Sequence, residues 1–339
     1  MPVPRRRGAG RRRRREAVLG ASPAPRGGSA DDDRPLRVLT GIVLDASPHL
    51  LVLHAEGREQ RLPLTPATKV WRGGPGGLAA LRPGREAIVR EAADGLGADR
   101  IWVDVRRVSG TILTRGRDTV EVDMGPHRGR VHVLLPPQAL GRVLVRHPRL
   151  EPGYLFDAIC VRSPGGPQAV RPGTSQPGYR ADDLAAPPPT APVPDALHGT
   201  ATWFDAGQDA EEARSGWGTR GGAESRIGGA AYPAVDAEDE AGGCADAPAG
   251  CVPLPFLSLG SELAVRNECT GRTGVVPVVE CGCAAALFCD RCVECGTSPR
   301  GRVVELTPAA FVGLGGELEA GCFNTVVRHG APDEDGLGR

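Results

Sequence analysis

The sequence predicts a mainly β protein, with two repeated small β-barrel-like units followed by a cysteine-rich β-domain. The hydrophobic residues come in short runs of mostly Val, Leu, Ile and Ala broken by Gly, Pro, Asp and Asn, which is typical of short strands. The 339 residues include 48 Gly and 32 Pro, which disfavour long helices. Nine of the ten cysteines fall within 79 residues near the C-terminus, which sets that part apart.

Residues 1–35 are predicted to be a disordered basic segment. Residues 1–30 contain nine Arg against the single acid Glu16. The apolar stretch Ala17–Ala21 is too short for the core of a signal peptide, although Ala21–Ala24 resembles a cleavage site, so no signal peptide is recognisable. No stretch of the chain is long and apolar enough to predict a transmembrane segment.

An internal repeat follows. Gly41–Leu44 recurs as Gly110–Leu113, and Leu81–Gly84 recurs as Leu150–Gly153, both at an offset of 69 residues. Two matches at one offset indicate two copies of a single unit. The copies are expected at residues 36–106 and 107–163.

Each copy is expected to form small barrel-like β-structure of the OB or a similar type. The Leu-x-Pro-Gly element is expected to form the turn that precedes the last strand. Three strands are expected in each copy. Leu50–His54, Gln60–Leu64 and Glu86–Arg90 of the first copy correspond to Thr119–Asp123, Arg130–Leu135 and Phe156–Arg162 of the second.

Residues 164–197 are expected to be a linker, because they include the proline-rich stretch Ala185–Pro194, which favours an extended chain. From His198 onward the chain carries ten Arg and no Lys against twenty-one Asp and Glu, a net charge of about −11. Binding to nucleic acid requires clustered cations, so this part is not expected to bind nucleic acid.

The third domain is expected at residues 198–330, with a tail at 331–339. Thr307 is placed to cap a short helix with Pro308 in its first turn. The expected strands are His198–Asp205, Val275–Glu280, a strand that ends at Glu305, and Cys322–Arg328. The segment Leu254–Asn267 leads into Val275–Glu280 through a turn at Thr270–Arg272.

The cysteines of this domain allow three interpretations. Dense cysteines in a small domain indicate disulfides in an oxidising compartment or metal ligands in a reducing one. Disulfides are favoured, because no His lies near the cluster in the sequence, and a thiol redox site is the least favoured reading. The disulfide candidates are Cys244, Cys251, Cys269, Cys281, Cys283, Cys289, Cys292, Cys295 and Cys322.

The order of motifs resembles the rare lipoprotein A family of septal-ring lytic transglycosylases, and more remotely expansins and barrel endoglucanases. The matching segments cover about 130 of the 339 residues: Gly199–Phe204, Leu254–Asn267, Gly271–Cys283 and Gly301–Ala310. The resemblance implies a cysteine-rich double-psi β-barrel that engages peptidoglycan or a related wall polysaccharide. It also implies an extracellular or cell-envelope location.

The resemblance implies candidate catalytic residues as well. Glu280 and Glu305 stand where the family carries aspartates, and Glu305 is the expected general acid. Asp205 corresponds to a catalytic aspartate of the barrel endoglucanases, while Trp203 and Phe204 offer faces for sugar stacking. The spacing from Glu280 to Glu305 is longer than in the family because of an insert that carries Cys289, Cys292 and Cys295.

Glu305, Glu280 and the aromatic pair also have structural explanations, and the explanation for Glu280 is a solvated strand end. Glu305 precedes a helix, where a carboxylate stabilises the helix dipole, and one of the two adjacent aromatic residues is expected in the core. The sequence therefore predicts a wall-polysaccharide protein that either cleaves the polymer as a lytic transglycosylase or binds it as an expansin-like module. An intracellular metal-thiolate protein is the further alternative. No cofactor and no specific metal site are predicted, and the oligomeric state is not.

Overall fold

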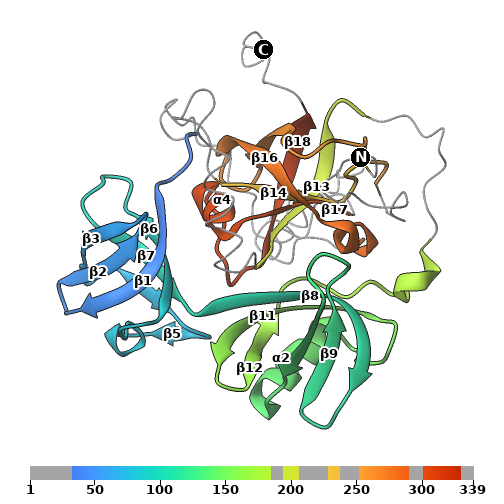
Figure 1. Ribbon diagram of the computed structural model, residues 1–339, viewed down its shortest axis with the longest axis horizontal. Helices are drawn as coiled ribbons and strands as arrows, with labels where there is room; N and C mark the ends of the chain where they lie inside the picture. Colours follow the sequence, from blue (N-terminus) through green and yellow to red (C-terminus); the bar gives the residue numbers. More distant parts are fainter. Residues whose placement is uncertain (1–32, 185–193, 206–227, 237–251, 290–300, 330–339) are drawn as a thin grey trace, which may run out of the picture. The chain divides into compact units, whose positions relative to one another are not determined.

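The structure is a computed structural model that describes residues 33–184, 194–205, 228–236, 252–289 and 301–329 (Figure 1). It confirms the mainly β fold class, because the described residues form one open sheet and two closed barrels with few helices. Within these residues no helix is long and apolar enough to cross a membrane.

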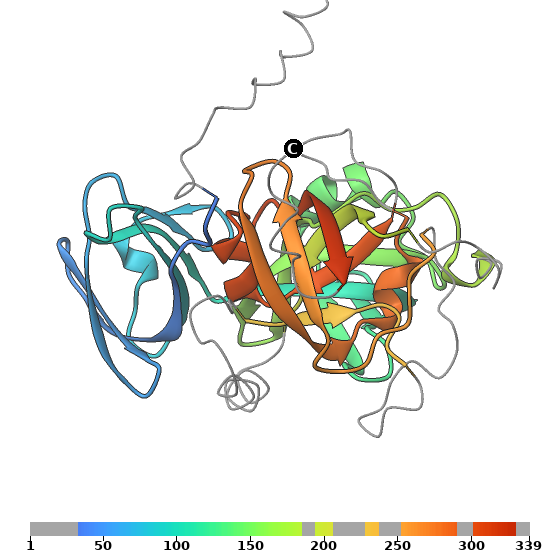
Figure 2. The same cartoon turned by 90° about the horizontal axis from the view of Figure 1, so that it is seen from above.

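The first repeat copy forms a mixed sheet in the order β3-β2-β1-β6-β7-β4-β5 (blue in Figure 2). The short 3₁₀ helix η1 spans Leu78–Ala80. The strands are β1 Val38–Ala46, β2 Leu50–Ala55, β3 Arg58–Pro63, β4 Lys69–Trp71, β5 Pro75–Gly76, β6 Glu86–Glu91 and β7 Ala98–Val103. The sheet is open, because β4 pairs in parallel with β7 and occupies the edge that β3 would need for closure.

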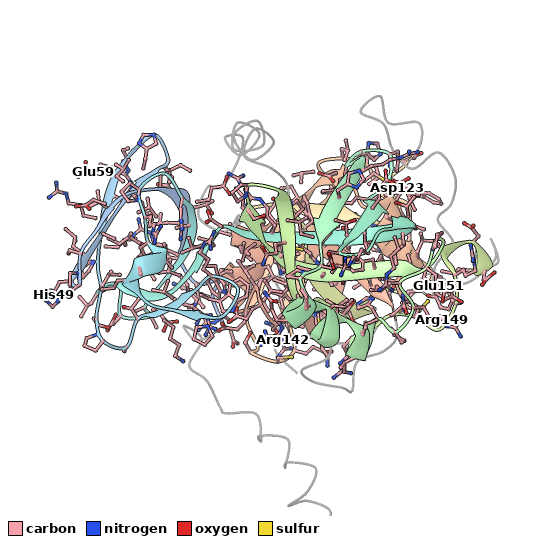
Figure 3. All side chains as sticks on the ribbon, turned by 90° about the horizontal axis from the view of Figure 1, so that it is seen from below. His49, Glu59, Asp123, Arg142, Arg149 and Glu151 are labelled. Carbon is pink, nitrogen blue, oxygen red and sulfur yellow. A yellow bond between two sulfur atoms is a disulfide. The ribbon has the colours of Figure 1, made fainter. Side chains whose placement is uncertain are left out.

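The second copy forms a closed five-stranded barrel in the order β10-β12-β11-β8-β9. Its strands are β8 Val105–Arg115, β9 Thr119–Asp123, β10 Arg130–Leu134, β11 Leu155–Ser163 and β12 Gly166–Pro172. Helix α2, Pro137–Arg146, carries Arg142 and lies over this barrel (Figure 3). A parallel bridge between Leu134 and Gln168 closes the ring.

The two copies match at the level of single hydrogen bonds. Val43 donates its N–H to Arg85, and Ile112 donates to Tyr154, at the same offset of 69. A β-bulge follows Val43 in β1 and Ile112 in β8. A Cβ added at Gly110 would lie 2.0 Å from the carbonyl oxygen of Asp123, and one at Gly41 would lie 2.3 Å from that of His54. Glycine is therefore required where the long strand of each copy crosses its neighbour.

The third domain forms a closed six-stranded barrel in the order β13-β17-β14-β16-β15-β18. Its strands are β13 Leu197–Trp203, β14 Ala230–Tyr232, β15 Glu262–Asn267, β16 Thr273–Cys281, β17 Arg302–Leu306 and β18 Cys322–His329. Two pairs are parallel, β13 with β17 and β14 with β16, and the other four are antiparallel. Exchanging β13, β14 and β15 for β16, β17 and β18 reproduces every pairing, so the topology has internal two-fold symmetry.

The core of this barrel consists of alternating inward residues such as Val265, Val278 and Leu306, together with Phe311 from helix α4. Helix α4, Pro308–Gly313, begins as expected, because the Thr307 side chain accepts a hydrogen bond from the N–H of Ala310 and Pro308 occupies the first turn. The 3₁₀ helix η4, Cys283–Leu287, follows β16 directly.

Two segments differ from the expected organisation. Residues 166–172, expected in the linker, form β12 and complete the second barrel. The expected boundary at residue 106 falls inside β8, because only Asp104 separates β8 from β7. A further 3₁₀ helix, η2 Ala181–Asp183, follows β12, and the proline-rich residues 185–193 lie outside the described residues.

Candidate functional site

Glu305 lies in β17 of the six-stranded barrel and is 1 % exposed. Arg128 donates from Nη1 to its Oε2 at 2.8 Å, and Arg302 donates from Nη1 to its Oε1 at 2.9 Å. The hydroxyl of Thr202 lies 3.5 Å from Oε1. Both oxygens of the carboxylate are therefore engaged by protein groups, and two of these groups are cations.

These cations set the ionisation of Glu305. Burial by itself would raise the pKa of this carboxyl, but attraction to Arg128, Arg302 and Arg107 outweighs it and lowers the pKa below its ordinary value. Glu305 is therefore ionised at neutral pH. A general acid must carry a proton to donate, so this arrangement does not suit the role that the family resemblance implies.

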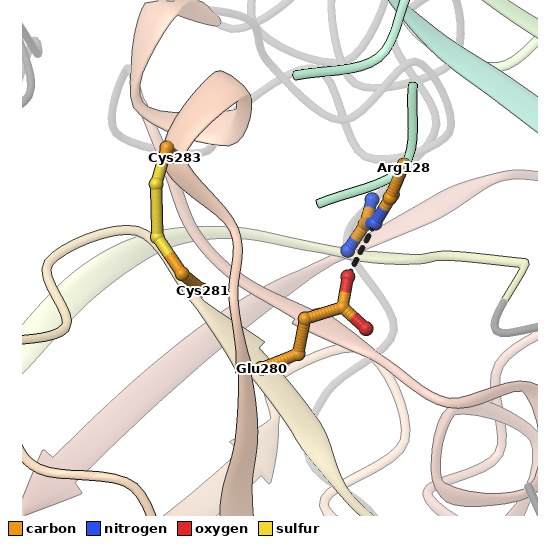
Figure 4. Close-up of a disulfide and its surroundings, with 4 residues drawn as sticks. All are labelled: Arg128, Glu280, Cys281 and Cys283. Carbon is orange, nitrogen blue, oxygen red and sulfur yellow. Dashed lines mark hydrogen bonds and ion pairs between the residues drawn. A yellow bond between two sulfur atoms is a disulfide. The ribbon is translucent and has the colours of Figure 1, made fainter. Parts of the chain in front are cut away.

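Arg128 also binds the second candidate carboxylate. Its Nε donates to Glu280 Oε1 at 2.6 Å, as the close-up shows (Figure 4). Its guanidinium lies 4.4 Å from the ring centroid of Phe204, and attraction to the two glutamates raises its pKa despite the burial that opposes the charged form. Arg128 belongs to the turn between β9 and β10, so a residue of the second barrel joins two carboxylates of the third.

The network continues behind Glu305. Arg302 donates from Nη2 to Asp157 Oδ2 at 2.7 Å, and Arg107 binds the same carboxylate from Nη2 at 2.7 Å. Thr174 donates to it as well, and the arginines lower the pKa of Asp157 although burial opposes the charge. Three arginines and three carboxylates thus alternate in one ion-pair network, which runs from Arg107 through Asp157, Arg302, Glu305 and Arg128 to Glu280. The positive and negative charges of these six side chains balance.

The remaining predicted residues lie apart from this pair or are covered. Asp205 is 28 % exposed on its side chain and forms an ion pair with Arg106 of β8 at 3.1 Å. Trp203 and Phe204 are each 1 % exposed. The indole of Trp203 donates to the carbonyl of Leu318 at 2.9 Å, and Phe204 lies under Arg128. Neither ring presents a face to a sugar in this structure.

Among the cysteines, Cys281 and Cys283 form a disulfide at the junction of β16 and η4. Cys289 is disulfide-bonded as well. Cys269 is exposed and Cys322 is buried, while Cys160 is a buried thiol whose pKa is raised chiefly by burial. The candidates Cys244, Cys251, Cys292 and Cys295 lie outside the described residues.

Little space remains at the two glutamates. The cavity bounded by residues 124–128, 281–284 and Glu305 has a volume of about 10 Å³, which is close to that of one water-sized sphere. A larger cavity of about 360 Å³ lies elsewhere, against the N-terminal turn of α2 and the side chains of Arg72, Arg142 and Arg162. Among the described residues, the cavity beside Glu305 is therefore much smaller than a sugar ring.

The sequence did not indicate Arg128, Arg302 or Asp157 as part of this site. Arg302 stands three residues before Glu305, a spacing that places two side chains on opposite faces of a regular strand, so the sequence offered no signal; the two residues pair because the register of β17 shifts after Arg302. His127 lies beside Arg128, and its ring comes within 4.8 Å of the sulfur atoms of Cys281 and Cys283. Nothing in the local sequence links His127 to cysteines more than 150 residues away.

Comparison with known proteins does not assign this sequence to a family. No protein-family profile matches the sequence, and no curated protein matches it. The topology of the barrel and the contacts of its carboxylates are therefore the observations on which a functional proposal rests.

Proposed function

We propose that the third domain is a double-psi β-barrel of the kind found in rare lipoprotein A and expansins, and that it binds a peptidoglycan-type wall polysaccharide without cleaving it. The topology supports the fold proposal. A closed six-stranded barrel with two parallel pairs and internal two-fold symmetry is what such a barrel requires. The ordered motifs from Gly199 to Ala310 support the relation to wall proteins.

The contact of Arg128 with both carboxylates is the observation that favours binding over cleavage. Cleavage of a glycosidic bond requires a protonated acid beside the leaving oxygen. Glu305 is buried, ionised and held by two arginines, and Glu280 shares one of them. The cavity that the described residues form beside Glu305 is too small for a sugar ring. The two glutamates therefore act as partners of Arg128 that join the second and third barrels.

Phe256 is the residue that we assign to the contact with the polymer. Of the large apolar side chains that the structure describes as exposed, Phe256 is the aromatic one, at 52 % exposure, and it precedes a bridge from Leu257 to Val235 in the third domain. An exposed ring offers a flat apolar face to the C–H groups of a sugar. The Cys281–Cys283 disulfide supports an oxidising location such as the cell envelope.

A sedimentation assay with purified peptidoglycan sacculi tests this proposal. The full chain is expected to sediment with the sacculi, and Phe256→Ala is expected to weaken sedimentation at least about fivefold, since a central aromatic contact contributes about 1 kcal/mol or more. Leu96→Ala is the matched control, because Leu96 is also an exposed apolar residue but lies in the loop between β6 and β7 of the first repeat copy. A chain that stays in the supernatant refutes the proposal.

A latent transglycosylase is the second candidate, and one observation favours it. Glu280 and Glu305 converge on a single side chain, which is the pairing that a glycosidase site would need if Arg128 withdrew. Release of anhydro-muropeptides from the sacculi, measured in the same assay, separates an enzyme from a binding module.

A further inference from the structure

Three potential metal ligands meet where the second barrel contacts the third. The ring nitrogens of His127 and the sulfur atoms of Cys281 and Cys283 place one ligand atom each within 4.8 Å of the other two. His127 comes from the turn between β9 and β10, and the cysteines flank Gly282 between β16 and η4. One nitrogen and two sulfur donors are a set that favours zinc among the common divalent ions.

The space between these side chains suits a single ion. The cavity of about 10 Å³ is lined by His127, Cys281 and Cys283 and has room for about one water-sized sphere. An organic ligand is far too large for it. The cavity and the cluster of donors are separate observations that indicate the same place.

The histidine is held in position by its neighbours. Arg128, the next residue, is fixed by its ion pairs with Glu280 and Glu305. The turn is closed by a hydrogen bond from the N–H of Gly129 to the carbonyl of Gly125 at 2.9 Å, and the carboxylate of Asp123 accepts from the N–H of Gly125 at 2.9 Å. None of these contacts involves the disulfide, so the position of His127 does not depend on it, and Cys281 is held separately by the pairing of β16 with Tyr232 of β14.

We propose that the reduced protein binds one Zn²⁺ through His127, Cys281 and Cys283, with water in the fourth position. A dithiol reductant first converts the disulfide into two thiols and is itself oxidised to a disulfide. Zinc then displaces one proton from each thiol and binds the two thiolates and the neutral imidazole. Because both sulfur atoms are consumed by the disulfide, the oxidised chain and the zinc-bound chain are alternative states. This inference does not depend on the proposed function.

The proposal is tested by measuring zinc binding to the full chain in competition with a chromophoric chelator. The chain is first reduced and then freed of reductant under anaerobic conditions. Because other reduced cysteines offer competing thiol ligands, the measurement is made in a background in which serine replaces Cys244, Cys251, Cys269, Cys289, Cys292 and Cys295. One equivalent of zinc is expected there, and His127→Ala should weaken its affinity at least about tenfold. Cys283→Ser should abolish the site, and the unreduced chain should bind none.

Cobalt provides a second measurement that follows the ligands directly. Co²⁺ bound to the reduced background protein is expected to show sulfur-to-metal charge-transfer absorption together with the visible bands of a tetrahedral ion. His127→Ala should alter the visible bands while far-UV circular dichroism stays unchanged, because His127 is exposed. Equal zinc affinity and equal cobalt spectra in the background protein and in His127→Ala would overturn the proposal, as would the absence of bound metal. Sedimentation with sacculi is scored separately, so failure of one idea leaves the other intact.

Discussion

Replacing Arg128 with alanine removes the cation that joins Glu280 and Glu305. The buried Glu305 then keeps Arg302 as a cationic partner at 2.9 Å, and Glu280 loses its 2.6 Å contact with the guanidinium of Arg128. Breaking a buried ion pair costs about 3–5 kcal/mol when one partner stays behind. The Arg128 and Glu280 side chains are 14 % and 12 % exposed, so water reaches part of the site. The lower end of that range, about 3 kcal/mol, is expected.

Urea unfolding at neutral pH measures the free energy of unfolding of the variant. Arg130→Ala is the matched control, because Arg130 is an exposed arginine at the start of β10, and a surface substitution of this kind changes stability by at most about 0.5 kcal/mol. A loss below about 1 kcal/mol for Arg128→Ala would refute the view that this residue holds the two barrels together through the carboxylates.

The same variant decides between a binding module and a latent enzyme. If the barrel only binds, Arg128→Ala releases no anhydro-muropeptides from sacculi, just as the unmodified chain releases none. Removal of Arg128 also removes a strong cause of the lowered pKa of Glu305, so the carboxyl becomes easier to protonate. Release of anhydro-muropeptides by Arg128→Ala alone would therefore show that the turn blocks a competent acid, and it would overturn the binding proposal.

Three further outcomes follow from the buried charges and the repeat. Glu305→Gln should lose about 2–4 kcal/mol of stability, because the amide leaves the cations beside it uncompensated, while sedimentation with sacculi in the cold stays unchanged; equal stability in urea would contradict this. Folding lowers the pKa of Glu305 and of Asp157, so the unfolded chain takes up more protons in acid than the folded chain does. The free energy of unfolding should therefore fall as the pH drops below about 4.5. A free energy of unfolding that stays constant down to about pH 3 would contradict this prediction. Gly110→Ala should destabilise by about 2 kcal/mol or more, because its Cβ would meet Asp123, whereas the helical control Gly141→Ala, whose Cβ meets nothing within 4 Å, should gain about 0.5–1 kcal/mol in thermal or urea unfolding.

The sequence was most informative where local chemistry determines structure. Short apolar runs located some strands of all three parts, such as β2, β6 and β16, but not β4, β7 or β14, and Thr307 and Pro308 located the start of α4. The constant offset of 69 residues carried through to the bulges after Val43 and Ile112. Whether each copy closes into a barrel was not predictable from the sequence, because closure depends on which strand pairs with the last strand of the copy. In the second copy β10 pairs with β12 and closes the barrel, whereas in the first copy β4 pairs with β7 and the sheet stays open.

The candidate site was less accessible to sequence reasoning. Arg128 stands 152 residues from Glu280 and 177 from Glu305, so only the folded chain brings them together. Alternation along a strand predicted that at least one of Trp203 and Phe204 lies in the core. Both are buried, because β13 ends at Trp203 and the guanidinium of Arg128 covers the ring of Phe204 beyond it.

The two repeat copies differ in the length of the hairpin turn that carries Arg128 in the second copy. In the first copy, Ala55 and Arg58 are paired and two residues, Glu56 and Gly57, form the turn. In the second copy, Met124 bonds to Gly129 and four residues form the turn, Gly125–Arg128. Exchanging these four residues for Glu-Gly should leave the second barrel folded, because both turns close the same kind of hairpin.

The exchange removes His127 and Arg128 together without altering either barrel's strands. Stability should fall by about as much as in Arg128→Ala, roughly 3 kcal/mol, because the ion pairs across the two barrels are what the longer turn supplies. Zinc binding by the reduced chain should weaken as it does in His127→Ala. A chain with the short turn that kept its full stability in urea would mean that the contact between the barrels rests on the Arg107–Asp157–Arg302 part of the network, and that the turn is dispensable.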